Sequence, residues 1–174
     1  MLFLTSIESL LATGVIGEGL SQPVKPFHKS FPDFITNHSR CTNPRFYISP
    51  GGQHLDLASN CLRVMNDRLE QNFLYLPNCA LNSEVKDLEE RVKEHISLAL
   101  QYACQFWHTH LTKAHGDVTA VISHLHLFLE KKFLAWLEVV SVLGVTRGAI
   151  TALEKLVSWL QEVCFDLPYD IIQC

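Results

Sequence analysis

Apolar residues recur at alternating intervals of three and four after residue 53, which is the period of an amphipathic α-helix. Two stripes come first: Leu55, Ala58, Leu62, Met65 and Leu69, then Leu88, Val92, Ile96, Leu100, Ala103, Trp107 and Leu111. A third stripe runs from Val121 to Val140, and a fourth from Ile150 to Cys164. Charged residues interrupt the third stripe, so we expect either one long helix there or two helices joined near Lys131.

The first fifty residues carry a different pattern, in which short apolar stretches alternate with glycine, proline and asparagine. A helical pattern over Leu2–Ala12 gives way to turn residues. Val24–His28 and Arg45–Ile48 each suit a short strand, and Pro32 suits the first turn of a short helix that ends near Thr36. One short helix with two strands and a small aromatic core is typical of a winged-helix-like unit.

We therefore expect a mainly α-helical protein, in which a small winged-helix-like unit with a short two-stranded wing is followed by an α-helical bundle. The predicted domains are a partial winged-helix-like domain over residues 1–52 and a helical domain over residues 53–165. Residues 166–174 are expected to form a frayed tail. The turn sequence Pro50-Gly51-Gly52 marks the predicted boundary.

The composition indicates that this chain has more apolar surface than an isolated domain would bury. Apolar residues make up 48% of the 174 residues and charged residues only 18%, against an average of about 25%. That balance indicates a folded module that packs against neighbours. The formal net charge is -4, and the 14 basic residues are scattered. Because a phosphate backbone binds to a concentrated cationic face, we expect no nucleic-acid partner.

The six cysteines have irregular spacing and include no C-x-x-C pair. Cys61, Cys104 and Cys164 fall on or near apolar stripes, where a free thiol behaves as a small hydrophobic residue. We expect reduced thiols and a cytoplasmic location. The apolar stretch Met1–Ile16 lacks a basic start and contains Glu8, unlike a secretory leader. No uncharged run is long enough to span a bilayer, so we expect no membrane partner.

Motifs of an autonomous enzyme do not occur in the sequence. The P-loop pattern G-x-x-x-x-G-K-[ST] is absent, and so are G-x-G-x-x-G, G-x-S-x-G and H-E-x-x-H. The six cysteines and nine histidines offer many pairs for a nucleophilic site, but nothing in the sequence selects one. We therefore expect no catalytic residue and no enzymatic activity in this chain.

The histidines do not predict a metal site. His108 with His110, and His124 with His126, are spaced i,i+2, which directs two helical side chains to different faces. Cys104 and His108 have the i,i+4 spacing of a helical ligand pair, but one pair does not complete a site. We interpret these histidines as solvent-facing and expect no metal. The three tryptophans are expected in the core, because aromatics at helical spacing are more often packed than part of a ligand cage.

The most unusual stretch is Phe27-His28-Lys29-Ser30-Phe31-Pro32-Asp33-Phe34, in which one histidine lies among three aromatic residues and a proline. We expect the ring of His28 to be buried between large apolar side chains. Such a histidine is either a core residue with a hydrogen bond to a nearby carbonyl or a sensor of a group bound beside it. The residues alone leave both interpretations open.

This octapeptide resembles the F-H-x-S-F-x-[DE]-[FY] stretch in the winged-helix domain of NACHT-type signal-transduction NTPases, the NOD-like receptor (STAND) class. Fungal members of that family resemble the chain most. Further blocks of resemblance follow in the same order, at Arg40-Cys41, Arg45–Ile48, Asp87–Val92 with His95-Ile96, Ala99–Trp107, Phe128–Lys131 and Trp136–Val139. Together the blocks cover roughly residues 5–163, the region that follows the nucleotide-binding core in that family.

The resemblance implies a role for His28. In that family the NACHT core binds ATP or ADP, the winged helix folds over it, and the motif histidine contacts the phosphates of bound ADP in the resting state. An imidazole can donate a hydrogen bond to a phosphate oxygen, and ADP and ATP place those oxygens differently. The implied partners are the NACHT nucleotide-binding core and a repeat-containing sensor domain, with no cofactor held by this chain alone.

Two departures from the family pattern shape the functional hypotheses. The P-loop and the magnesium-binding acidic residues are absent, and Phe165–Cys174 differs from the family's continuation, so we expect a fragment that does not hydrolyse nucleotide. The first hypothesis is a non-catalytic regulatory fragment that packs on a nucleotide-binding core and helps distinguish ADP from ATP. The alternative is a stand-alone helical adaptor that binds another protein. A winged-helix DNA-binding protein is disfavoured by the acidic balance.

Overall fold

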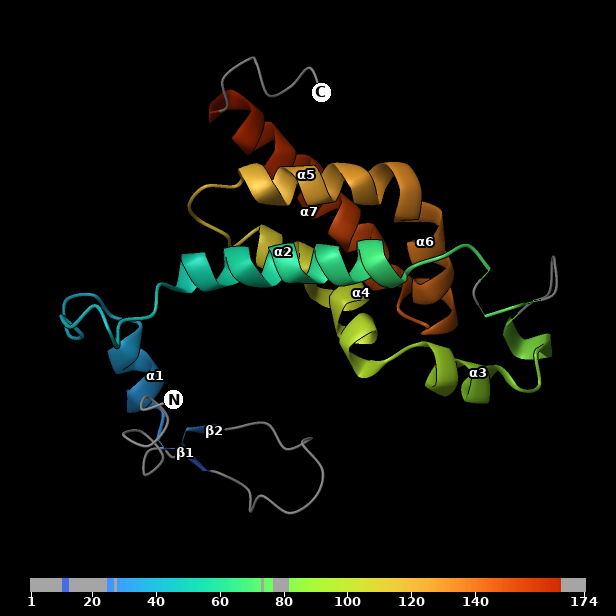
Figure 1. Ribbon diagram of the computed structural model, residues 1–174, viewed down its shortest axis with the longest axis horizontal. Helices are drawn as coiled ribbons and strands as arrows, with labels where there is room; N and C mark the ends of the chain where they lie inside the picture. Colours follow the sequence, from blue (N-terminus) through green and yellow to red (C-terminus); the bar gives the residue numbers. More distant parts are fainter. Residues whose placement is uncertain (1–10, 13–24, 27, 73, 77–81, 167–174) are drawn as a thin grey trace. The chain divides into compact units, whose positions relative to one another are not determined.

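The computed structural model describes residues 11–12, 25–26, 28–72, 74–76 and 82–166 (Figure 1). The chain falls into two compact units, Met1–Pro50 and Gly51–Cys174. The sequence-based boundary lies between residues 52 and 53. Helices make up most of the described chain, which confirms the mainly α-helical class. The predicted frayed tail lies outside the described residues, apart from residue 166.

The described residues of the first unit form two very short strands and one short helix. β1 (Leu11–Ala12) pairs antiparallel with β2 (Lys25–Pro26). Helix α1 (Ser30–Ile35) covers nearly the same residues as the predicted helix at Pro32. After α1 the chain turns back, and the N–H of Ile48 donates to the carbonyl of Ile35 at 2.9 Å.

The predicted two-stranded wing is wrong. Arg45–Ile48 is not a strand, because the carbonyl of Asn43 accepts from the N–H groups of both Phe46 and Tyr47 at 3.0 Å. The side chain of Asn43 also accepts from the N–H of Arg45, at 3.0 Å. This asparagine turn overrides the strand propensity of the aromatic residues that follow.

Within the strand predicted over Val24–His28, Lys25–Pro26 forms a strand, whose partner is Leu11–Ala12 rather than Arg45–Ile48. His28 is not in the strand, and residues 24 and 27 lie outside the described residues. The predicted helix over Leu2–Ala12 is wrong at its last two residues, which form β1. The remainder of that prediction, residues 2–10, lies outside the described residues.

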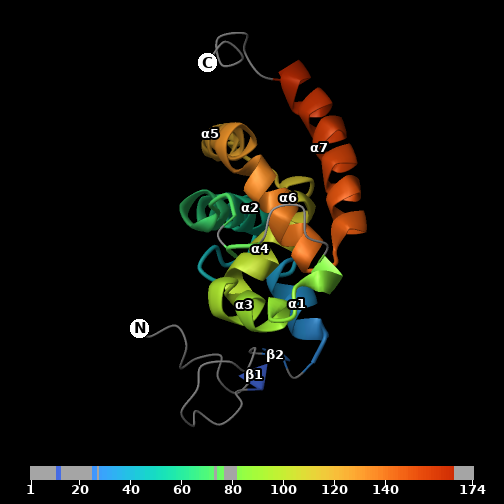
Figure 2. The same cartoon turned by 90° about the vertical axis from the view of Figure 1, so that its right-hand side faces the viewer.

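The second unit is a helical bundle whose elements follow one another closely. They are α2 (Pro50–Arg68), the short 3₁₀ helix η2 (Asn82–Glu84), α3 (Leu88–His95), α4 (Leu98–Leu111), α5 (Thr119–Leu127), the π-helical turn η3 (Phe128–Lys132), α6 (Phe133–Val142) and α7 (Thr146–Asp166). Figure 2 shows α7 along one side and α2 with α5 on the other, with α4 and α6 between them. Helix α4 is therefore covered on two sides.

An aromatic cluster forms the centre of this bundle. Trp107, Phe128 and Trp136 are each at most 1% exposed, and their ring centroids lie 5.3 to 6.0 Å apart. The indole N–H of Trp136 donates to the carbonyl of Cys104 at 2.9 Å, which ties α6 to α4. Trp159 on α7 is also buried. The interpretation of the three tryptophans as core residues is confirmed.

The second predicted stripe is divided between two helices. Ile96 is buried on the stripe but has an extended backbone (φ -106°, ψ 93°), which ends α3. Ser97 then begins α4, because its hydroxyl accepts from the N–H of Leu100 at 3.3 Å. The third stripe forms two helices, α5 and α6, which the π-helical turn η3 joins near Lys131. Of the two predicted alternatives, the one with two joined helices is confirmed.

Charged side chains from three helical elements hold the loop between α2 and α3. Arg91 donates to the carbonyls of Leu74 and Tyr75, both at 2.9 Å. Lys132 donates to the carbonyl of Leu69 at 2.7 Å, and Glu138 accepts from the N–H of Asn72 at 2.8 Å. The loop needs this support because Asn72 and Tyr75 both have φ of 52°, which is uncommon for residues other than glycine.

Two glycines lie where helix α2 meets the turn after α4, at positions that a residue with a side chain would occupy poorly. A Cβ on Gly51 would lie 2.7 Å from the Cβ of His115, so a side chain there forces this contact apart. Gly116 has φ of +127°, which L-residues with a side chain rarely adopt. Among the described helices, none has both the length and the apolar character needed to cross a bilayer.

Candidate functional site

His28, the predicted phosphate contact, lies just before helix α1 in the first unit. Its Nδ1 is 2.8 Å from the hydroxyl oxygen of Ser30 and accepts from the backbone N–H of Ser30 at 3.1 Å. Its own carbonyl accepts from the N–H of Phe31 at 3.1 Å. The start of α1 therefore fixes the position of this histidine.

The hydrogen bond from Ser30 determines which nitrogen of His28 can donate. Because a backbone N–H can only donate, the Nδ1 that accepts it carries a lone pair. In the neutral ring the proton then resides on Nε2. The described residues provide no hydrogen-bond partner for Nε2, and the side chain is exposed. His28 thus presents an N–H donor to its surroundings.

The expectation that His28 is buried between aromatic anchors is wrong. His28 is exposed, Phe31 is half-buried, and Phe34 is 39% exposed. Phe34 does not pack inward. Its ring lies beneath the guanidinium of Arg40, whose central carbon is 5.8 Å from the centroid of the Phe34 ring. Phe27 lies outside the described residues. Helix α1 is only six residues long and has no buried residue, so it provides no packed face against which the ring could be buried.

Two histidines of α4 contradict the expectation that the paired histidines face solvent. His108 is 7% exposed and His110 is 8% exposed. The i,i+2 spacing does place them on different faces of the helix, but both faces are covered. His110 points towards α2, where its Nδ1 lies 2.9 Å from Nδ1 of His54. His124 is half-buried against Ser59, and only His126 is exposed.

His110 is the middle member of a hydrogen-bonded chain. Its Nε2 lies 2.6 Å from the hydroxyl of Tyr102, and its Nδ1 bonds to His54 of α2. Burial, with the nearby His54 and Lys113, lowers the pKa of His110 below its usual range. A neutral His110 ring suits this series of hydrogen bonds from Tyr102 to His54, since a neutral imidazole accepts at one nitrogen and donates at the other. We interpret these hydrogen bonds as a structural link between α2 and α4.

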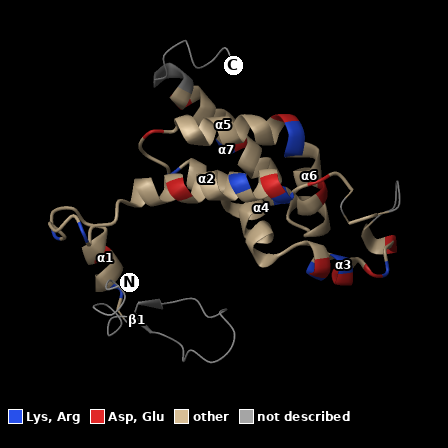
Figure 3. Ribbon diagram, viewed as in Figure 1, with Lys and Arg blue, Asp and Glu red and all other residues tan. Residues whose placement is uncertain are grey.

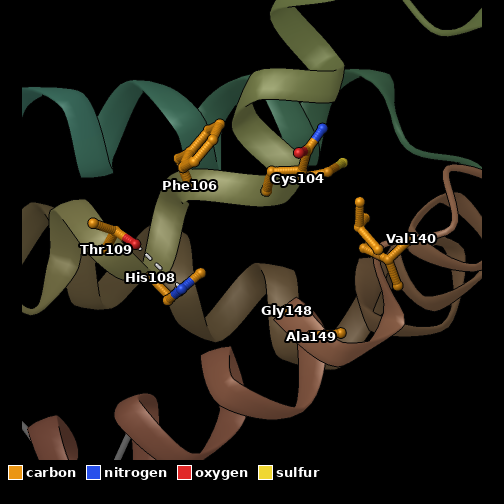
Figure 4. A pocket seen from close by; sticks show the side chains of 9 residues that line it. Cys104, Phe106, His108, Thr109, Val140, Gly148 and Ala149 are labelled. Carbon is orange, nitrogen blue, oxygen red and sulfur yellow. Dashed lines mark hydrogen bonds between the residues drawn. The ribbon is translucent and has the colours of Figure 1, made fainter.

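His108 lines a cavity of about 340 Å³ between α4, α6 and the start of α7 (Figure 4). Its lining comprises Cys104, Gln105, Phe106, His108, Thr109, Val140, Val145, Gly148 and Ala149. Figure 4 shows the His108 ring on the side of α4 that faces α7, with a bond of 3.2 Å between Nε2 and the Thr109 hydroxyl. Its Nδ1 is buried and has no hydrogen-bond partner among the described residues.

The two lining residues with a shifted pKa, His108 and Cys104, are both uncharged at neutral pH. Burial, with the nearby Lys155 and His110, lowers the pKa of His108, so the ring is uncharged at neutral pH. Burial also raises the pKa of the Cys104 thiol to about 12, which leaves it protonated and a poor nucleophile. The i,i+4 pair Cys104 and His108 thus meets at one cavity, but it lacks the thiolate that nucleophilic chemistry needs.

The described residues contain no group of three or more histidine, cysteine or acidic side chains that could hold a metal ion. In the view of Figure 3, lysine and arginine are spread over several helices and interspersed with acidic residues. The described helices therefore show no concentrated basic face in that view. Within the part of the chain that the structure describes, His28 and the His108 cavity are two features with chemistry available to a ligand.

Comparisons with protein-family models, with curated proteins and with solved structures found no match to this chain.

Proposed function

We propose that this chain is a non-catalytic regulatory region of a NACHT-type signal-transduction NTPase. In this proposal the first unit belongs to the winged-helix domain and the second to the helical domain that follows it. The chain packs on a nucleotide-binding core, and His28 donates a hydrogen bond to a phosphate of ADP. The two-stranded wing over Val24–His28 and Arg45–Ile48 is not part of the proposal.

The order of the sequence blocks supports this assignment. The octapeptide around His28 is followed by the blocks at Arg45–Ile48, Ala99–Trp107 and Trp136–Val139 in the order in which fungal members of the family carry them. One short motif could arise by chance, whereas several blocks in a fixed order are far less frequent. The helical second unit agrees with what the resemblance implies for this region.

The geometry of His28 is the single structural observation that carries the proposed role. A phosphate sensor needs an exposed N–H donor in a fixed orientation, and Ser30 holds Nδ1 as the acceptor so that Nε2 carries the proton. Hydrogen bonds to an ionised phosphate are about twice as strong as those between neutral groups. Exposed Phe34 and Ile48 in the same unit offer apolar surface to a partner.

The proposal is tested with the purified chain and a NACHT core of a fungal family member, supplied as a separate protein. The core is loaded with ADP, loaded with a non-hydrolysable ATP analogue, or left empty. We expect the chain to co-elute with the ADP-loaded core in size-exclusion chromatography and to bind the other two forms more weakly, since a switch requires differential affinity.

A matched pair of variants separates His28 from general packing. His28→Ala is expected to remove the preference for ADP, whereas His38→Ala, an exposed histidine of the same unit, is expected to retain it. Equal binding to all three forms of the core would overturn the regulatory proposal. An unchanged ADP preference in His28→Ala would leave the docking intact but overturn the sensor role.

The adaptor alternative is favoured by one surface feature. Leu98, Tyr102 and Phe106 follow one another at i,i+4 spacing on α4 and are 81%, 43% and 42% exposed. Such a stripe suits contact with another protein. Under this alternative, the charge-introducing variant Leu98→Lys abolishes partner binding whichever nucleotide is present. Under the regulatory proposal, the nucleotide controls binding.

A further inference from the structure

We propose that the contact between His54 of α2 and His110 of α4 is a pH-sensitive latch. The contact holds the start of α2 in helical form at neutral pH, and it opens when both imidazole rings are protonated. Both histidines belong to the second unit, as does the segment of α2 from Gly51 onward. The proposal is therefore independent of nucleotide sensing by His28.

The two rings face each other through the same kind of atom. Nδ1 of His54 lies 2.9 Å from Nδ1 of His110, and the two ring centroids are 5.1 Å apart. A ring nitrogen donates a hydrogen bond only when it carries a proton, and it accepts only when it does not. The hydrogen bond between the two Nδ1 atoms therefore contains one proton, which either ring can supply.

The number of protons on the two rings decides whether this contact holds. A first proton added to the neutral pair binds at Nε2 of either ring and leaves the bond between the Nδ1 atoms in place. Nε2 of His110 can take it because the Tyr102 hydroxyl, 2.6 Å away, both donates and accepts. A second added proton leaves an N–H on both Nδ1 atoms, which then repel each other. The latch therefore opens on the second proton.

The surroundings of the pair disfavour that second proton while the latch is closed. Burial, followed by the nearby His54 and Lys113, lowers the pKa of His110, and His108 of the same helix also interacts with it electrostatically. Among the described residues, no acidic side chain forms an ion pair with either ring. The open form binds one proton more than the closed form. Opening therefore becomes up to about tenfold more favourable for each pH unit below about 6.5.

The start of α2 depends on this contact because its own sequence favours a helix only weakly. It contains Gly51 and Gly52, and its first turn has no acidic residue. Glycine is among the weakest helix formers, and an acidic side chain would stabilise a helix at this end. From Ala58 onward α2 is held by buried side chains. Opening of the latch thus unwinds residues 51–57 and lengthens the non-helical connection between the two units.

NMR of the 15N,13C-labelled full chain follows the rings and the backbone in one sample. Imidazole 15N signals report the protonation of His54 and His110, and 13Cα shifts report helical structure. Between pH 7.5 and 4.5 we expect residues 51–57 to lose most of their helical 13Cα shift, in step with the second protonation of the pair. Residues 58–66 are expected to keep theirs.

Three variants isolate the latch. His54→Gln can donate to or accept from His110 but cannot be protonated, so residues 51–57 are expected to stay helical at both pH values. His54→Leu removes the hydrogen bond, so these residues are expected to lose helical shift already at pH 7.5. His126→Gln, at an exposed position on α5, is the matched control and is expected to behave as the parent does.

Four results overturn the proposal. Residues 51–57 of the parent stay helical when both rings are fully protonated, in which case the contact is not a latch. They stay helical in His54→Leu at pH 7.5, in which case they do not depend on it. His54→Gln loses helical shift at pH 4.5 as the parent does, in which case acid acts elsewhere. Residues 58–66 unwind together with residues 51–57, in which case acid unfolds the whole helix. None of these outcomes changes the ADP preference expected of His28.

Discussion

Replacing His108 by phenylalanine is expected to stabilise the ligand-free protein. Most substitutions of a buried residue destabilise a fold, so the sign of this prediction is informative. The ring of His108 is buried, yet its Nδ1 lacks a partner among the described residues. Phenylalanine retains a planar ring of similar size and removes this unpaired nitrogen.

The magnitude follows from two opposing terms. Removing a buried unpaired polar atom recovers about 1–3 kcal/mol. Losing the bond of 3.2 Å between Nε2 and Thr109 costs about 0.5–1.5 kcal/mol. The net gain is about 1 kcal/mol, which moves the urea midpoint upwards by about 0.5 M for a typical dependence of stability on urea.

The pH dependence of the free energy of unfolding provides a second test of this substitution. Burial lowers the folded-state pKa of both His108 and His110 below the usual value of 6.5. Between the lowered and the usual pKa the unfolded chain binds more protons, so stability falls as the pH drops through 6.5. Each histidine contributes at most about 1.4 kcal/mol per pH unit. His108→Phe removes the contribution of His108, so its stability falls less than that of the parent between pH 7.5 and 5.5.

The assay is urea unfolding followed by tryptophan fluorescence, because Trp107 and Trp136 lie in the core. Curves are measured at pH 7.5 and 5.5 for the parent, for His108→Phe and for His126→Phe, an exposed histidine on α5 that serves as the control. A destabilisation of His108→Phe by more than about 1 kcal/mol at pH 7.5 would refute the reasoning. It would mean that the ring nitrogen is already paired.

Three further predictions concern the loop before α3 and the buried thiols. Arg91→Met is expected to lower the free energy of unfolding by about 2 kcal/mol in urea melts, because the carbonyls of Leu74 and Tyr75 lose a forked donor; an unchanged midpoint contradicts this. Tyr75→Asn is expected to raise stability by about 0.5–1 kcal/mol, since asparagine tolerates the φ of 52° better than tyrosine; a lower midpoint argues against backbone strain there. Burial raises the thiol pKa of Cys61 to about 11 and of Cys104 to about 12, so both should react with a thiol reagent at pH 8 only as fast as the protein opens; immediate labelling in the native state counts against it.

The apolar period predicts the long helices well, because it reports directly which face is buried. Ala58, Leu62, Met65 and Leu69 are all fully buried along the first stripe. The same signal cannot detect the break at Ile96, because that side chain remains on the buried face while its backbone leaves the helix. Ser97, a strong N-cap residue, is the local signal that identifies the break.

The burial of His108 and His110 depends on tertiary packing that spacing does not contain. An i,i+2 pair does point to two faces, and the usual inference is that one of them meets solvent. In this bundle His110 meets His54 of α2, while His108 meets the start of α7. The i,i+4 relation of Cys104 and His108 was a usable signal for the cavity, but Val140 and Gly148 lie too far along the sequence to be associated with it.

The first unit shows how local turn chemistry overrides strand propensity. Phe46 and Tyr47 favour a strand by composition, but the hydrogen bonds of Asn43 place them in a turn. The octapeptide drew attention to His28, but the aromatic packing expected around its ring is wrong. Its ring is exposed, and its fixed orientation comes from Ser30 rather than from aromatic packing.

The contact between His28 and a nucleotide phosphate is the central claim, and the 31P NMR spectrum of ADP bound to a NACHT core tests it most directly. Adding the parent chain is expected to move the β-phosphate signal, because we propose that Nε2–H of His28 donates to one of its oxygens. His38→Ala is expected to move the signal equally, and His28→Ala is expected to bind without moving it. The same movement with His28→Ala as with the parent would contradict the account.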